Sequence, residues 1–107
     1  MDITERNAKL SGFFKECVKL LESKGKDYNP TGVAFDDLQE AAKDIGRGPV
    51  QVLWVYMGKH IAAVRSFVKN GAVASEPIEK RLMDLANYCG MMCVLLESLK
   101  HEKKEKG

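Results

Sequence analysis

The sequence predicts an all-α, four-helix domain that self-associates as a helical bundle. Apolar residues recur at spacings of three and four along most of the 107-residue chain, which is the spacing of one helix face. Glycine, proline and asparagine separate these stretches and predict the turns between helices. Apolar residues make up 45% and charged residues 30% of the chain. This balance and the length predict a single helical domain over residues 1–107.

The first predicted helix begins at residue 2 or 4 and ends at residue 24, before Gly25. Its apolar face is formed by Leu10, Phe13, Cys17 and Leu20. The Asn-Pro and Gly residues of segment 26–32 predict a loop. A short helix over residues 36–45 follows, and Gly46 and Gly48 are expected to separate it from the next helix.

The third predicted helix covers residues 49–70, with Pro49 in its first turn. Its apolar stripe is Val50, Leu53, Met57, Ile61, Val64 and Val68. The fourth helix is expected to begin near Ser75, a favourable N-cap. Its main stripe alternates spacings of four and three and is formed by Ile78, Leu82, Leu85, Cys89, Met92, Leu96 and Leu99. A second stripe beside it is formed by Tyr88, Met91 and Leu95.

The two stripes make the fourth helix apolar over a wide arc. In so short a chain, such an arc predicts a subunit interface as well as a core. We therefore expect a homo-oligomer formed through this helix, with the helix over residues 49–70 as a second candidate surface.

The composition also predicts a cytoplasmic protein. The cysteine count is odd, and Cys89 and Cys93 stand four apart on a predicted helix, so we expect reduced core thiols. No secretory signal pattern and no apolar run of about 20 residues is seen, so no membrane partner is expected. The net charge is only +2, and its basic excess lies in a tail over about residues 100–107 that we expect to fray. Nucleic acid is therefore not an expected partner.

Asp84 lies within an apolar stretch of the fourth helix, with Asn87 and Tyr88 on or near the same side. A carboxylate in such a place needs a partner, because an unpaired buried charge is costly. Lys59 lies in an equally apolar part of the third helix, beside His60, and is the expected partner of Asp84. The pair would either fix the register of the helices or line a ligand pocket. By itself, His60 is more typical of a satisfied core histidine than of a ligand or base.

The sequence also carries weak patterns for a phosphate site and for a metal site. Arg47 lies in a glycine turn that runs into a helix N-terminus, which is suited to phosphate but is also an ordinary inter-helix turn. Glu76 and Glu79 have the spacing of a magnesium-binding pair. However, Arg81 stands three residues before Asp84, and the third helix has no acidic residue. We expect no metal ligands, no cofactor and no catalytic residues.

Segments 24–28 (KGKDY), 57–62 (MGKHIA) and 79–88, which ends in DLANY, resemble the nucleotide-modification-associated domain family. Its members are small helical proteins of bacteriophages and bacteria, distantly similar to MazG-like all-α pyrophosphohydrolases. The resemblance spans roughly residues 20–97. It implies a link to nucleotides and a phage origin, and hence the host cytoplasm. The candidates carried over from it are Asp27, Tyr28, Lys59, Asp84, Asn87 and Tyr88.

The function we expect is nucleotide binding without strong catalysis, for example sequestration of a cyclic signalling nucleotide by a phage protein. Cations would bind the phosphate and tyrosines would stack on the base. The expected ligand-binding residues are Lys26, Asp27, Tyr28, Arg47, Lys59, His60, Asp84, Asn87 and Tyr88. One alternative is a magnesium-dependent nucleoside triphosphate pyrophosphohydrolase, in which case magnesium is the cofactor. Another is a helical interaction protein with no small ligand.

Overall fold

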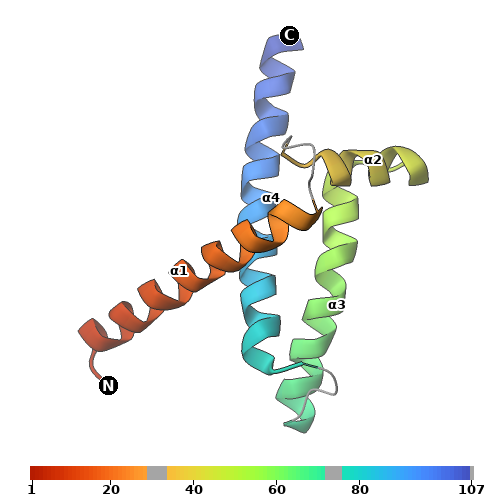
Figure 1. Cartoon of the computed structure of the whole chain (residues 1–107). Coiled ribbons are helices and arrows are strands. Elements are labelled where there is room, and N and C mark those ends of the chain that lie inside the picture. Colours follow the sequence, from red (N-terminus) through yellow and green to blue (C-terminus); the bar gives the residue numbers. More distant parts are fainter. Residues whose placement is uncertain (29–33, 72–75, 107) are drawn as a thin grey trace.

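The structure is a computed structural model that describes residues 1–28, 34–71 and 76–106, with side chains over 1–24, 34–71 and 76–102. Within these ranges it has four helices and no strand (Figure 1). The helices are α1 (Ile3–Tyr28), α2 (Asp36–Ile45), α3 (Pro49–Asn70) and α4 (Ile78–Lys106). The predicted all-α four-helix domain is therefore confirmed.

Local sequence signals fix several helix ends. The Asp2 side chain caps α1, because its Oδ1 accepts the backbone N–H of Glu5 at 2.8 Å. Gly46 and Gly71 end α2 and α3 with φ values of 68° and 73°, in the left-handed region that glycine adopts without strain. The bounds predicted for these two helices agree with the structure.

The ends of α1 and α4 differ from the prediction. α1 does not stop at Gly25 but continues to Tyr28. One interior glycine costs a helix only about 1 kcal/mol, so it does not by itself end a helix whose neighbouring turn is docked. α4 extends to Lys106, through most of the segment expected to fray. Ser75, the expected N-cap of α4, lies outside the described residues.

The core lies between α2, α3 and α4. Leu53 of α3 and Leu95 of α4 are fully buried. They are joined by Leu38, Ala42 and Val52, and by a ring of half-buried apolar residues that includes Phe35, Val50, Tyr88, Met91 and Leu99. α3 and α4 run side by side, α2 packs on the first part of α3, and α1 crosses α4 (Figure 1).

The face of α4 that packs inward differs from the prediction. Leu82, Cys89 and Leu96 of the main predicted stripe are exposed, and the other members of that stripe are half-buried. The second stripe faces the core instead, together with the polar side chains of Arg81 and Asp84. Cys93 is exposed as well, so the prediction of core thiols is wrong for both cysteines of α4 and holds only for Cys17.

Much of α1 is also uncovered. Cys17 is its one buried residue over the part of the helix whose side chains are described, and Phe13 and Leu20 are half-buried. Leu10 and Phe14 are exposed, and the N-terminal half of the helix projects away from α4 (Figure 1).

By length and composition alone, one described segment, Ile78–Glu102 of α4, could cross a membrane. Core helices of soluble proteins meet the same criterion, but only 11% of the relevant part of this helix is buried. The expectation that no membrane is involved therefore stays a prediction.

Leu95→Ala should lower the free energy of unfolding by about 3 kcal/mol, because it opens a cavity at a fully buried position. Leu10→Ala is the matched control: Leu10 is 47% exposed, so the loss should stay below about 1 kcal/mol. Urea denaturation followed by circular dichroism measures both variants. Equal losses at the two positions would mean that α4 packs on a different face.

Candidate functional site

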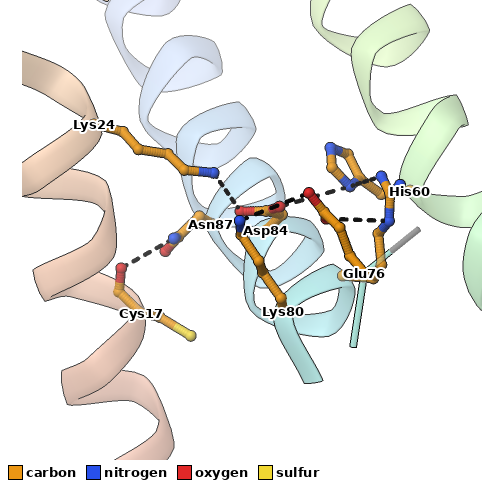
Figure 2. A network of polar contacts seen from close by, with 8 residues as sticks. Cys17, Lys24, His60, Glu76, Lys80, Asp84 and Asn87 are labelled. Carbon is orange, nitrogen blue, oxygen red and sulfur yellow. Dashed lines mark hydrogen bonds and ion pairs between the residues drawn. The ribbon is translucent and has the colours of Figure 1, made fainter. Parts of the chain in front are cut away.

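Seven polar side chains, six from three helices and one from the segment before α4, meet near the start of α4, and we call them the polar cluster. Lys24 comes from α1, His60 from α3, Glu76 from the segment before α4, and Lys80, Arg81, Asp84 and Asn87 from α4. Figure 2 shows Lys24 and His60 pointing toward Asp84 from opposite sides. The cluster therefore joins α1 and α3 through α4.

Asp84 is the centre of the cluster, and its side chain is 10% exposed. Its Oδ1 accepts a hydrogen bond from the Lys24 ammonium at 3.0 Å, and its Oδ2 lies 3.9 Å from Nδ1 of His60. The prediction that Asp84 is buried and paired is confirmed.

The prediction that Lys59 pairs with Asp84 is wrong. Adjacent residues on a helix point about 100° apart, so Lys59 and His60 cannot both face α4. His60 is the one that does, and Lys59 is exposed. Lys24 supplies the ammonium group from α1 instead.

His60 is held in its neutral form. Its Nδ1 lies 3.4 Å from Nη1 of Arg81, and a guanidinium can only donate, so Nδ1 is the acceptor and the proton belongs on Nε2. Burial lowers the pKa of His60 below its ordinary value of 6.5; the Asp84 carboxylate opposes this effect, and the Arg81 and Lys59 charges add to it.

Arg81 and Glu76 form the second ion pair of the cluster. The Nε of buried Arg81 lies 3.4 Å from Oε2 of Glu76, and the Lys80 ammonium lies 3.6 Å from Oε1 of the same carboxylate. Both carboxylates of the cluster, Glu76 and Asp84, are therefore matched by cations.

Asn87 ties α1 to α4 rather than facing a ligand. Its Nδ2 donates to the backbone oxygen of Cys17 at 2.9 Å (Figure 2). Burial, followed by the Asp84 charge, raises the pKa of the Cys17 thiol. This cysteine is therefore a protonated packing residue at the α1–α4 contact.

Tyr88 lies beside the cluster, half-buried, with its ring centre 5.2 Å from that of His60. Burial raises the pKa of its hydroxyl, and the Asp84 charge adds to this effect. Tyr88 therefore stays neutral at physiological pH.

The structure brings together four of the nine predicted ligand-binding residues: His60, Asp84, Asn87 and Tyr88. Arg47 and Lys59 are both exposed. They are separated by most of the first half of α3, on the order of 15 Å along its axis at 1.5 Å per residue. Neither of these two cations belongs to the polar cluster, and their role in ligand binding stays a prediction.

The other three predicted residues, Lys26, Asp27 and Tyr28, belong to the last turn of α1, and their side chains lie outside the described residues. Conversely, sequence reasoning missed Lys24, Glu76, Lys80 and Arg81 as members of the cluster. For Lys24 a signal was present, because it follows Cys17 and Leu20 at spacings of seven and four and so shares their face.

Within the described residues, no group of three or more His, Cys, Asp and Glu side chains is placed to hold a metal ion. Comparison with protein-family models, with curated proteins and with solved structures finds no match for this chain. The resemblance to the nucleotide-modification-associated domain family therefore stays a prediction.

Asp84→Ala should lower the free energy of unfolding by about 2–4 kcal/mol, because it removes the buried carboxylate that pairs with Lys24 and lies beside His60. Glu97→Ala on the exposed part of α4 is the control and should change stability by less than about 0.5 kcal/mol. Chemical denaturation measures both variants. A loss at Asp84 no larger than that at Glu97 would show that the cluster does not hold the helices together.

The lowered pKa of His60 predicts acid sensitivity. The folded chain binds the imidazole proton less readily than the unfolded chain, so stability from neutral His60 is complete above pH 6.5 and is lost as the pH falls below that value. Urea denaturation from pH 5 to pH 8 should show a steeper loss for the wild type than for His60→Gln. The exposed His101 supplies the control, and His101→Gln should follow the wild type. A wild-type curve parallel to that of His60→Gln would contradict the buried neutral imidazole.

Proposed function

We propose that this protein binds a nucleotide, with its phosphate at the polar cluster, and does not strongly catalyse its hydrolysis. The observation that carries the proposal is the charge of the cluster. Three cations, Lys24, Lys80 and Arg81, surround two carboxylates, Glu76 and Asp84. With His60 neutral, the cluster has one positive charge in excess and favours an anion.

The arrangement of the cluster gives an anion access to its cations. The side chains of Lys24 and Lys80 are 41% and 47% exposed, whereas that of Asp84 is 10% exposed. The two ammonium groups therefore form a solvated rim above a buried floor. A phosphate at the rim would accept charge-assisted hydrogen bonds from both lysines without displacing the Asp84–Lys24 pair.

A nucleotide also needs a surface for its base. Tyr88 supplies an aromatic ring beside the cluster, stacked in a tilted arrangement near His60. Stacking of a base on such a ring is tolerant of base identity. The proposal therefore names the class of ligand, a phosphate-bearing nucleotide, and sequestration of a cyclic signalling nucleotide is one version of it.

The same ion pairs argue against the magnesium-dependent alternative. A pyrophosphohydrolase needs carboxylate oxygens free to bind the metal. Glu76 and Asp84 already face cations, so a divalent ion would have to displace Lys24, Lys80 and Arg81. The third alternative, an interaction protein with no small ligand, is favoured by the exposed apolar surface of α4.

Isothermal titration calorimetry against mono-, tri- and cyclic nucleotides, with and without magnesium, tests the proposal. Lys24→Ala and Lys80→Ala should each weaken binding about tenfold, the loss expected for one charge-assisted hydrogen bond. Lys19→Ala is the matched control, because Lys19 lies on α1 like Lys24 but pairs only with exposed Glu16 in the described part of the chain. It should leave the affinity unchanged.

Other outcomes would favour the alternatives. Binding that Arg47→Ala weakens and Lys24→Ala does not would place the phosphate at the turn before α3. Magnesium-dependent turnover of about 1 per second or more would favour the pyrophosphohydrolase. If no nucleotide binds the wild type, the interaction protein becomes the leading interpretation.

A further inference from the structure

The most regular apolar pattern of the chain runs along a side of α4 that the rest of the chain covers only in part. Leu82, Cys89 and Leu96 are exposed there, whereas half-buried Met92 and Leu99 also pack against the core. We call this pattern the outer seam, and its members are Ile78, Leu82, Leu85, Cys89, Met92, Leu96 and Leu99. Their spacing of four and three continues for three heptads, which is the pattern of a helix that packs along another helix. Leu82 and Leu96 are 41% and 45% exposed, and no helix covers Cys89. In the described part of the chain, no helix covers the whole seam, although its spacing is typical of a helix that packs along another helix.

The overall dimensions agree with a missing partner. The chain exposes 8044 Å² and has a radius of gyration of 16.3 Å. A compact monomer of 11.9 kDa would expose about 6,000 Å² and have a radius of about 13 Å. The excess of about 2,000 Å² is shared between α4 and the projecting half of α1, and it is larger than the roughly 800 Å² per partner of a standard protein interface.

We propose that a second copy of this chain covers the outer seam, with the two α4 helices packed antiparallel about a two-fold axis near Gly90 and Met91. In this register, Leu82 lies opposite Leu99 of the partner subunit, and Leu85 lies opposite Leu96 of the partner subunit. Cys89 lies opposite Met92 of the partner subunit. Symmetry repeats each pair, so the interface has six apolar layers and no polar one.

The charges beside the seam favour this register. It brings Glu79 to within two residues, or about 3 Å along the helix, of the level of Lys100 of the partner subunit on both sides of the axis, and it does the same for the small residues Ala86 and Cys93. Glu79 and Lys100 are exposed, and neither has an ion pair within the described part of the chain. A parallel register would pair neither charge and would stack Cys89 on its own copy.

A second copy fits this surface better than a membrane does. α4 is long and apolar enough to span a bilayer, but the same segment carries Arg81 and Asp84 in ion pairs with other parts of the chain. Moving that segment into hydrocarbon would break these pairs or take them out of water. Packing along another α4 leaves these ion pairs in place, because the seam contains none of the residues that form them.

Light scattering and sedimentation equilibrium of the full chain test the proposal. The wild type should have twice the mass of the 11.9 kDa chain at micromolar concentration. Leu96→Glu should weaken the dimer at least a hundredfold, because it places two carboxylates between apolar layers. Val68→Glu is the control: Val68 is 76% exposed on α3, away from the seam, so the mass should not change. Circular dichroism confirms that both variants fold.

Oxidative cross-linking with copper phenanthroline tests the antiparallel register. Met92→Cys should give a disulfide-linked dimer, because Cys89 of one copy faces position 92 of the other. Adding Cys89→Ser should abolish this link. All of these variants carry Cys93→Ser, because Cys93 is also exposed. If the variant without Cys89 still cross-links, position 92 faces its own copy and the helices are parallel. Glu79→Lys should weaken the dimer severalfold, and combining it with Lys100→Glu should restore the wild-type affinity.

Three results would overturn the proposal. They are a monomeric wild type, a dimer that survives Leu96→Glu, and flotation of the wild type with phosphatidylcholine vesicles in place of dimerisation. The nucleotide experiment is independent of all three, because the seam contains neither Lys24 nor Lys80.

Discussion

The structure depends on the partial burial of one carboxylate. Asp84 could stay charged inside the molecule only if cations reached it, and Lys24 of α1 reaches it at 3.0 Å while Arg81 and neutral His60 fill the space toward α3. This requirement places α1 across α4, with Asn87 holding the backbone of Cys17 one turn further along. It also decides which side of α4 faces inward.

The inward orientation of Asp84 leaves apolar side chains on another face of α4 exposed. α4 has two apolar stripes, and the stripe that shares a face with Asp84 is the shorter one. When Asp84 turns inward, the longer stripe is only partly covered: Met92 and Leu99 still reach the core, but leucines are exposed at positions 82 and 96. A lone chain would gain more by burying the longer stripe, since each buried leucine contributes about 2 kcal/mol. Our proposal of a second copy on the outer seam accounts for this orientation, because that copy would cover the leucines that the single chain leaves exposed.

Sequence alone predicted the helices well because their signals are local. The spacing of apolar residues gave the fold class, and Gly46, Pro49 and Gly71 gave the bounds of α2 and α3. The same reasoning expected α1 to end at Gly25, where tertiary contacts of the preceding turn outweigh the small cost of one glycine. The position of a helix end that depends on tertiary contacts cannot be predicted from the residues next to that end.

The candidate site was predictable only in part, for a similar reason. The need of Asp84 for a partner follows from its apolar neighbours, and that prediction is confirmed. Whether Lys24 or Lys59 pairs with Asp84 depends on how their helices pack against α4. Lys24 and Asp84 are 60 residues apart in sequence, and the spacing of apolar residues does not show which lysine lies nearer to Asp84. Likewise, a helix with two apolar stripes does not reveal which one faces its own core.

The two proposals together constrain how ligands would be bound. In the antiparallel dimer, Asp84 lies six to seven residues from the two-fold axis, or about 10 Å along α4 at 1.5 Å per residue. The two polar clusters of a dimer are then about 20 Å apart along the helix pair. A mononucleotide is too short to bridge them. Each chain would therefore carry its own site, and self-association would serve to cover the outer seam rather than to complete the site, so ligand should saturate at one molecule per chain in the dimer.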